Sequence, residues 1–207
     1  MKLYYSPLSS NSRKVRIVAA LLGIELELQN VELPKGEQRR PEYLAINPMG
    51  KVPVLADDDF VLPESAAIMI YLAETKPGNT LYPDDRQARA EVNRWLFWAA
   101  NHWAPAVVAL VFEKVLKQRY FNGGAPDPVQ IKRQEEQIAR FATVLDAQLA
   151  KYPWVAGDTL TLADISIAPA FAAFVPLPTQ SHAHIHGWFK RIQALPAWQA
   201  TEPPKMP

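Results

Sequence analysis

The chain has 207 residues, of which 49% are hydrophobic and 21% are charged, a composition that indicates a globular protein with one large domain or two small ones. Its formal net charge of +1 gives no bulk electrostatic case for binding nucleic acid or an anionic membrane. Because the chain has no cysteine, disulfides, thiolate metal sites and redox cycling of the protein's own sulfur are excluded.

Two features of the sequence bear on location. No apolar run approaches the length of a membrane span, and the N-terminus "MKLYYSPLSS" lacks the apolar core of a signal peptide. We therefore expect a cytoplasmic protein without a membrane partner.

The first part of the chain alternates short strand-like segments with helical ones. "SRKVRIVAALLG" repeats apolar residues at helical spacing and stops at Gly23, while "KVPVL" and "FVL" flank the polar turn "ADDD" as a hairpin. This order predicts a small mixed sheet with helices on its faces. The strands are expected at 2–5, 26–33, 51–55 and 60–62, and the helices at 12–23, 39–47 and 64–75.

The chain changes character in "TKPGNTLYPDDRQ", where proline and glycine cluster and after which strand signals disappear. We expect a first domain at 1–76, a linker at 77–86 and an all-helical domain at 87–207. Asp84 or Asp85 can cap the first long helix of that second domain.

The helical domain is predicted from three amphipathic stretches. The first long helix contains residues 91–116 and should bend at Pro105, because proline removes one internal hydrogen bond. Residues 128–150 form the second long helix, and residues 187–198 close the domain.

Residues around position 161 carry a full helix start signal. Thr161 suits the N-cap, Asp164 follows three residues later, and Leu160 and Ile165 occupy the hydrophobic-staple positions. We expect Thr161 and Asp164 to have a structural role.

Pro53 stands inside a short apolar segment, "KVPVL", where it cannot donate to a sheet ladder. If the Val52–Pro53 bond is cis, Val52 can present its N–H and C=O outward to an extended peptide ligand. The alternative is an edge strand or bulge that binds nothing.

The next helix opens with Pro63, Glu64 and Ser65. The free N–H groups of a first helical turn suit a carboxylate, and Glu64 offers an acceptor to an ammonium group beside it. Together they describe a site for the α-amino-acid end of a ligand. The alternative is an ordinary helix start in which the dipole favours an acidic residue.

Four polar residues, Ser9, Ser10, Asn11 and Ser12, lie between the first strand and the first helix. At least one of them should cap the helix, and Ser10 is favoured for that task. No His, Asp or Glu lies within residues 6–13 to activate a serine, so an acyl-transfer nucleophile is not expected. Donors at a positive helix end suit the stabilisation of a ligand's anion.

Two further groups of residues are candidates for sites. His182, His184 and His186 alternate in "SHAHIHG", a spacing that could chelate a metal from a strand, but the pattern of loop into helix makes alternate residues diverge. We therefore predict no metal site. Among the aromatic residues, Trp95, Phe97, Trp98 and Trp103 are interpreted as core and interface rather than a cofactor site.

Four segments in order resemble soluble glutathione S-transferases, closest to the serine-using theta- and phi-like groups and their bacterial relatives. The segments are "LYYSPLSSNSRKVRIVAALLGI", "NVELPKGEQRRPEYLAINPMGKVPVL", "LPESAAIMIYLAE" and "PWVAGDTLTLADISIAP". The resemblance spans nearly the whole chain. It implies an α/β thioredoxin-like N-terminal domain followed by an all-α C-terminal domain.

The resemblance also implies roles for particular residues. Pro53 is expected to follow a cis bond, with Val52 bonding the cysteinyl backbone of glutathione and with Glu64 and Ser65 holding the γ-glutamyl end. Lys51, Gln38 and Arg39 match positions that contact the glycine end. Ser9 aligns with the catalytic serine that donates to the sulfur, while Asn11 competes for this role because some bacterial relatives rely on an asparagine there. The second-substrate pocket is expected to include Leu8, Asn101 and Pro105.

A single hydroxyl at a helix start is energetically sufficient for this chemistry. A thiol with a pKa of about 8.5 needs about 2 kcal/mol to be half ionised at pH 7. One hydrogen bond to a charged group supplies about 1.5–3 kcal/mol, and a helix N-terminus about 0.3–1 kcal/mol more. We therefore expect glutathione as co-substrate, with no cofactor, metal or protein cysteine.

The leading hypothesis is a homodimeric transferase that adds the glutathione thiolate to electrophilic, mostly apolar small molecules. The first alternative is a glutathione-dependent reductase of disulfides or peroxides. The second is a non-catalytic interaction module with the same fold.

Overall fold

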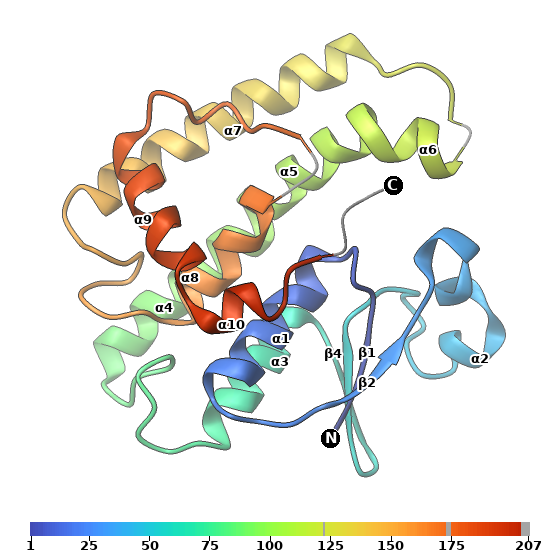
Figure 1. The fold of residues 1–207 in the computed structure, drawn as a ribbon, viewed down its shortest axis with the longest axis horizontal. Coiled ribbons are helices and arrows are strands. Elements are labelled where there is room, and N and C mark those ends of the chain that lie inside the picture. The colour runs from blue at the N-terminus through green and yellow to red at the C-terminus, as the bar shows by residue number, and fades with distance from the viewer. Residues whose placement is uncertain (122, 173–174, 204–207) are drawn as a thin grey trace. The chain divides into compact units, whose positions relative to one another are not determined.

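The computed structural model describes residues 1–121, 123–172 and 175–203 (Figure 1). The chain forms two compact units. Unit 1 comprises Met1–Tyr82 together with the segment from Leu195 onward, and unit 2 comprises Pro83–Ala194. The break after Tyr82 falls inside the stretch expected to be a linker. The domain boundaries at 76 and 87 stay a prediction.

Unit 1 is built on a four-stranded sheet with the order β2-β1-β3-β4. β1 pairs parallel with β2 and antiparallel with β3, and β3 pairs antiparallel with β4. This mixed sheet confirms the predicted α/β class. The strands are β1 (Lys2–Tyr5), β2 (Glu27–Asn30), β3 (Val54–Asp57) and β4 (Phe60–Pro63).

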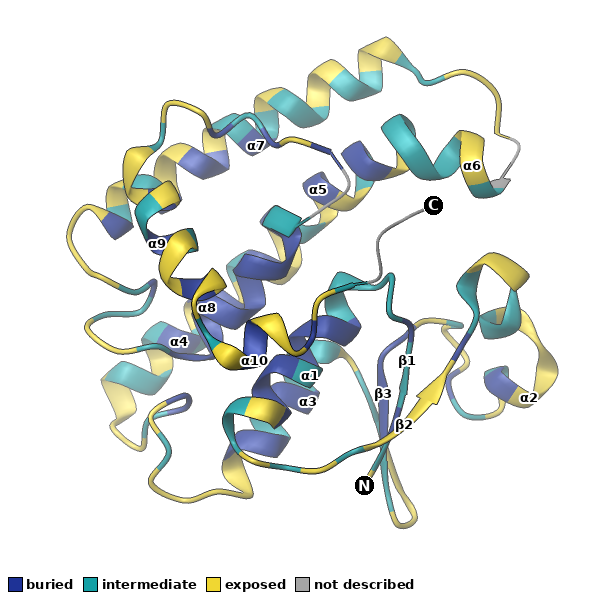
Figure 2. Ribbon diagram, in the orientation of Figure 1, coloured by how far each residue is buried: buried dark blue, intermediate teal, exposed yellow. Residues whose placement is uncertain are grey.

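Helices α1 (Ser10–Leu21) and α3 (Ser65–Glu74) pack against each other in unit 1, and both carry buried residues (Figure 2). The edge strand β2 is exposed along its whole length. It ends before the predicted residue 33, because the chain turns into short 3₁₀ segments that begin at Leu33 with Pro34 in the first turn. Helix α2 (Pro41–Leu44) is also shorter than the predicted 39–47.

The last described helix, α10 (Pro196–Gln199), belongs to unit 1 because of contacts with α1. The guanidinium of Arg13 donates to the carbonyl of Trp198 at 3.0 Å and lies 3.7 Å from the centre of the Trp198 ring. A cation over an indole face is a favourable electrostatic contact. Arg13 is thus a packing residue of unit 1.

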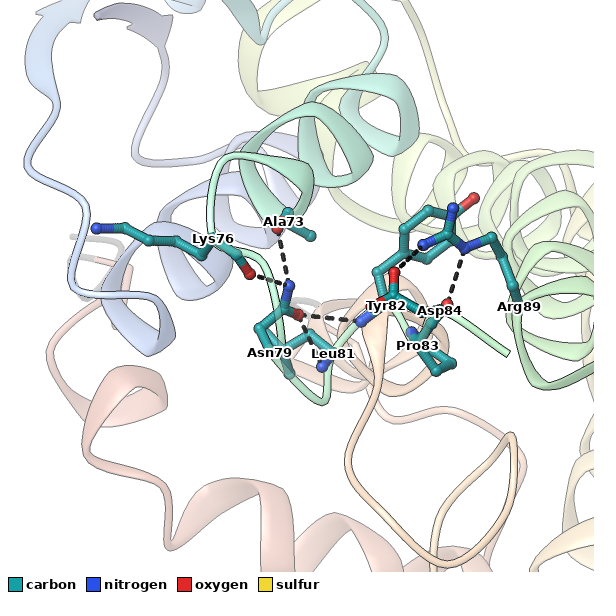
Figure 3. A network of polar contacts seen from close by, with 8 residues as sticks. All are labelled: Ala73, Lys76, Asn79, Leu81, Tyr82, Pro83, Asp84 and Arg89. Atoms are coloured by element: carbon teal, nitrogen blue, oxygen red, sulfur yellow. Dashed lines mark hydrogen bonds and ion pairs between the residues drawn. The ribbon is translucent and has the colours of Figure 1, made fainter. Parts of the chain in front are cut away.

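Asn79 turns the chain after α3 (Figure 3). Its amide nitrogen donates to the carbonyls of Ala73 and Lys76 at 2.8 and 2.7 Å. Its amide oxygen accepts from the N–H groups of Leu81 and Tyr82 at 2.9 and 3.1 Å. One side chain therefore pairs with backbone carbonyls at the end of a helix and with backbone N–H groups at the start of the next segment.

Unit 2 contains helices and no strand of the sheet within the part of it that the structure describes. Helix α4 begins where the sequence predicted, since the Asp85 carboxylate caps it by accepting from the N–H groups of Gln87 and Ala88. Its helices are α4 (Arg86–Trp98), α5 (Ala104–Val111), α6 (Lys117–Phe121), α7 (Pro128–Leu149), α8 (Leu162–Ile167) and α9 (Ala183–Gln193).

The first long helix adapts to Pro105 by widening. A π-helical turn, Ala99–Trp103, separates α4 from α5 directly before the proline, and a second such turn follows at Phe112–Leu116. Such turns are a recognised way to accommodate a disrupted hydrogen-bond ladder.

The helical run Arg86–Tyr120 corrects the expectation that no apolar segment reaches membrane length. By length and composition alone it could cross a membrane, and 44% of its most apolar stretch is buried inside the protein. A buried core helix passes the same test, so this run is weak evidence for a membrane span.

Aromatic side chains fill the core of unit 2. Trp95 and Trp103 are almost fully buried, and Trp103 stacks on Phe171 with ring centres 5.0 Å apart. Phe97, in contrast, is 68% exposed. The core part of this interpretation is therefore confirmed for the two buried tryptophans, and an interface role for the exposed Phe97 stays a prediction.

Candidate active site

The register of the sheet brings three chain segments to one edge of unit 1. Tyr4 near the end of β1 pairs with Val54 at the start of β3, and Val54 pairs in turn with Pro63 at the end of β4. The loop after β1, the residues before β3 and the residues after β4 therefore meet at the same end of the sheet. These three segments contain most of the site residues predicted from sequence.

The segment before β3 presents a free peptide group. The Val52–Pro53 bond is cis, as predicted. The carbonyl of the preceding Lys51 is held by the Tyr43 hydroxyl at 2.7 Å and the Asn47 amide at 2.8 Å. No described residue hydrogen-bonds to the N–H or C=O of Val52. Those two groups are available to an extended peptide ligand.

The start of α3 is an uncapped helix N-terminus. The side chain of its N-cap residue, Glu64, makes no capping hydrogen bond. The N–H groups of the first turn therefore have no capping side chain as a partner. Glu64 is exposed and has φ +74° and ψ 112°, a conformation that is strained for a residue other than glycine. Strain of this kind concentrates at ligand-binding positions.

The start of α1 is capped by Ser9, which corrects the preference for Ser10. The Ser9 hydroxyl oxygen accepts from the N–H of Ser12 at 3.2 Å, and Ser10 is the first helical residue. The reason is backbone geometry, since Ser9 has the extended conformation that an N-cap needs. Because its oxygen acts as acceptor here, the Ser9 hydroxyl proton is free to donate to a ligand.

Asn11 lies in the first turn of α1 and is half-buried. Its side-chain oxygen accepts from the ammonium group of Lys14 at 2.9 Å. Lys14 is only 4% exposed, and sequence reasoning missed it. The missed signal was its position one helical turn after Asn11, on the same face of the helix.

Gln38 lies beside the segment that carries Lys51. A side chain at Gly50, which has φ +60°, would approach the Gln38 carbonyl oxygen to 2.9 Å, so glycine is required at this close contact. The side-chain oxygen of Gln38 is buried and has no hydrogen-bond partner among the described residues. The side chains of Arg39 and Lys51 are exposed.

Family models match both parts of the chain. The model of the glutathione S-transferase N-terminal domain matches residues 3–80, and that of the C-terminal domain matches residues 128–200. This chain belongs to the glutathione S-transferase family. Its fold is the expected α/β thioredoxin-like domain with an all-α domain, and it is an enzyme that uses glutathione as co-substrate without a cofactor.

Full-length relatives carry the same name. Glutathione S-transferase F10 of Arabidopsis thaliana is 36% identical, covering 94% of this chain and 93% of the relative. Glutathione S-transferase 3 of Zea mays is 38% identical, covering 97% and 92%. Glutathione transferase F7 from Populus trichocarpa has a similar structure, with a TM-score of 0.88 and 28% identity over 97% of this chain and 96% of that one.

The residues expected to line a second-substrate pocket in this glutathione S-transferase fall in different units. Leu8 lies in the loop between β1 and α1 of unit 1 and is partly buried. Asn101 and Pro105 belong to unit 2 and are exposed. A shared pocket stays a prediction.

The three histidines have separate partners. His184 bonds the Asp146 carboxylate at 3.0 Å, His186 bonds the carbonyl of Thr179, and His182 faces the hydroxyl of Thr143. Within residues 1–121, 123–172 and 175–203, no group of three His, Cys, Asp or Glu side chains is placed to hold a metal ion.

The capping residues Thr161 and Asp164 have the predicted structural geometry. The Thr161 hydroxyl accepts from the N–H of Ala163, and the Asp164 carboxylate accepts from the N–H of Thr161, which forms a capping box. Burial raises the pKa of Asp164 to about 6, although four hydrogen bonds favour its charged form.

Proposed function

We propose that this glutathione transferase ionises the glutathione thiol at the start of α1, with Ser9 as the donor to the sulfur, and adds the thiolate to apolar electrophiles. The observation that supports this proposal is the convergence at one sheet edge of the free Ser9 hydroxyl proton, the free Val52 peptide and the uncapped α3. Each of these groups matches one part of an extended glutathione molecule.

Glutathione would lie at this end of the sheet, where its backbone pairs with the chain as a short added strand. The Val52 peptide pairs with the cysteinyl backbone, which fixes the direction of the ligand. The free N–H groups at the start of α3 and the Ser65 hydroxyl bind the γ-glutamyl carboxylate, while Glu64 accepts from the neighbouring ammonium group.

The glycine end of glutathione carries a second carboxylate. Lys51 and Arg39 are exposed cations that form no ion pair within the described chain, so both are available to it. Gln38 contributes an amide next to Lys51. Its buried, unpartnered oxygen would accept from a peptide N–H of the ligand.

The thiolate then forms by loss of the sulfhydryl proton to solvent. The Ser9 O–H donates to the sulfur anion, and the N-terminal dipole of α1 adds favourable potential. Together, the Ser9 hydrogen bond and the helix dipole supply roughly the 2 kcal/mol that half ionisation of the thiol at pH 7 requires. Nucleophilic attack of the thiolate on the electrophile completes the reaction, with the leaving group or an added proton balancing the charge.

The finer assignments are also proposals. The phi class is supported by the names of the plant relatives and by the fold. A cytoplasmic homodimer is proposed because of the family membership. Leu8 of unit 1 and Asn101 and Pro105 of unit 2 are each proposed to contact the second substrate.

A second candidate activity is the reduction of disulfides with glutathione. It is favoured by Asn11, whose amide N–H₂ has no acceptor among the residues that the structure describes and so offers a second donor near the helix start.

The two activities are separated by a direct comparison. The purified protein is assayed with glutathione and an aryl halide, and in parallel with glutathione and a mixed disulfide of glutathione. We expect conjugation to dominate and the protein to be retained on glutathione-agarose. Turnover of the disulfide alone would favour the reductase, and failure to bind glutathione would refute the proposed site.

A further inference from the structure

Lys14 is an unusual residue within unit 1. It lies on α1 one turn after Asn11, and its side chain is 4% exposed. The ammonium group donates to the Asn11 side-chain oxygen at 2.9 Å, which is its only hydrogen bond to the described residues. Burying a charged group is costly unless it is paired.

No carboxylate compensates this buried charge. Lys14 takes part in none of the ion pairs of the described chain, whereas the exposed Lys2 and Lys35 each pair with a glutamate. Desolvation lowers the pKa of Lys14 to about 8. The lysine is therefore still mostly charged at pH 7, and no carboxylate of the described residues pairs with it.

The neighbouring cation is accounted for differently. Arg13 is equally buried, but its guanidinium bonds the Trp198 carbonyl and lies over the Trp198 ring. Packing thus explains Arg13, whereas no corresponding contact explains Lys14.

The contact with Lys14 also fixes the Asn11 amide. An ammonium group can only donate, so the Asn11 oxygen must face Lys14 and the amide N–H₂ must point elsewhere. No described residue accepts a hydrogen bond from that N–H₂. The donor is therefore held in one orientation without being used by the protein.

We propose that Lys14 is a positioning residue for the bound thiolate. It orients the Asn11 amide so that its N–H₂ donates toward the sulfur, and it supplies the buried positive charge that the thiolate balances. This inference rests on the proposed placement of the glutathione sulfur at the start of α1. It adds to Ser9 a residue that never touches the substrate.

The test measures the pKa of bound glutathione from the ultraviolet absorbance of its thiolate as a function of pH. The variants are Lys14→Met, which removes the charge, Lys14→Gln, which keeps an N–H donor, and Lys14→Arg, which keeps the charge. Arg16→Met serves as a control, because Arg16 is a half-exposed cation on the same helix over the Tyr5 ring.

We expect Lys14→Met to raise the bound thiol pKa by about one unit, because it removes both the nearby positive charge and the donor that orients Asn11. Lys14→Gln, which keeps a donor to Asn11, should raise it by less. Lys14→Arg and Arg16→Met should leave it near the parent value. The dissociation constant of glutathione at low pH, where the thiol is protonated in all variants, should change less than threefold. Unfolding in urea should show Lys14→Met to be as stable as the parent or more stable.

An unchanged thiol pKa in both Lys14→Met and Lys14→Gln would overturn the inference, as would a shift of equal size in Arg16→Met. Ser9→Ala is titrated alongside to separate the two proposals. If Ser9→Ala raises the thiol pKa and the Lys14 variants do not, the role of Lys14 is wrong and the sulfur site stands. If no variant shifts it, the sulfur does not lie at the start of α1.

Discussion

Asp164 of α8 accepts a hydrogen bond of 2.8 Å from the indole N–H of Trp188 in α9. The same carboxylate accepts from the N–H of Val155 and from both the N–H and the hydroxyl of Thr161. Asp164 is fully buried. The capping residue therefore also joins a loop and a second helix to α8.

Replacement of Asp164 should cost more than the loss of a cap. Asp164→Ala leaves the buried donors of Val155, Thr161 and Trp188 without an acceptor, so we expect the free energy of unfolding to fall by about 3 kcal/mol or more. Thr161→Ala removes one cap bond and one of the several bonds to Asp164, and should cost about 0.5–2 kcal/mol. Urea unfolding of both variants measures the difference. Equal losses would contradict the wider role of Asp164.

The titration of Asp164 predicts the sign of a pH effect. Its pKa is raised by burial to about 6, against about 3.9 in the unfolded chain. Between these two pH values the folded state binds more protons than the unfolded state. The contribution of protonated Asp164 to the free energy of unfolding is therefore fully present below pH 4 and is lost as pH rises to 6. The loss amounts to about 3 kcal/mol.

The measurement compares the free energies of unfolding of the parent and Asp164→Asn from pH 4 to pH 7. We expect the advantage of the parent to shrink as pH rises. A constant difference would show that the folded-state pKa is not raised.

Ser9 should govern the acidity of bound glutathione. Ser9→Ala is expected to raise the bound thiol pKa by about one to two units, which corresponds to one hydrogen bond to a charged group. It should also lower stability by about 0.5–2 kcal/mol, because Ser9 caps α1. Asn11→Ala should give a smaller shift, and Ser10→Ala none. A shift confined to Asn11→Ala would assign the sulfur to the asparagine and favour the reductase.

Glu64 is expected to lower the stability of the fold through its backbone conformation and to raise the affinity for glutathione through its carboxylate. Glu64→Gly relieves the positive φ and should stabilise the fold by about 1 kcal/mol. The same change removes the partner of the γ-glutamyl ammonium and should weaken glutathione binding by about 1.5–3 kcal/mol. Calorimetry and urea unfolding give the two quantities.

Asp58→Gly is the control for Glu64, since Asp58 has φ +49° in the turn between β3 and β4. It should raise stability slightly and leave the affinity for glutathione unchanged. Unaltered affinity in Glu64→Gly would remove Glu64 from the binding site.

Asn79 should matter for folding although it lies in a region that the sequence assigns to a linker. Asn79→Ala removes four hydrogen bonds and is expected to lower the free energy of unfolding by about 1–3 kcal/mol. Thr80→Ala, at the exposed neighbouring residue, should be nearly neutral. A loss of similar size in Thr80→Ala would show that the effect is not specific to the hydrogen bonds of Asn79, and would contradict the prediction.

The sequence by itself determined the features that depend on near neighbours. The capping of α4 by Asp85 and of α8 by Thr161 involves partners within about three residues, and the order of strands and helices follows from apolar periodicity. The cis bond before Pro53 was predicted from the resemblance to glutathione S-transferases, because the proline taken alone favoured an edge strand or bulge.

Tertiary structure decided what depends on distant parts of the chain. Ser9 rather than Ser10 caps α1 because Ser9 is the last residue with an extended backbone before the helix. The burial of Lys14 was set by helix packing. Asp164 meets Trp188 across 24 residues, and Arg13 meets Trp198 across 185. Such contacts leave no local pattern, because only the packing of whole elements brings their side chains together.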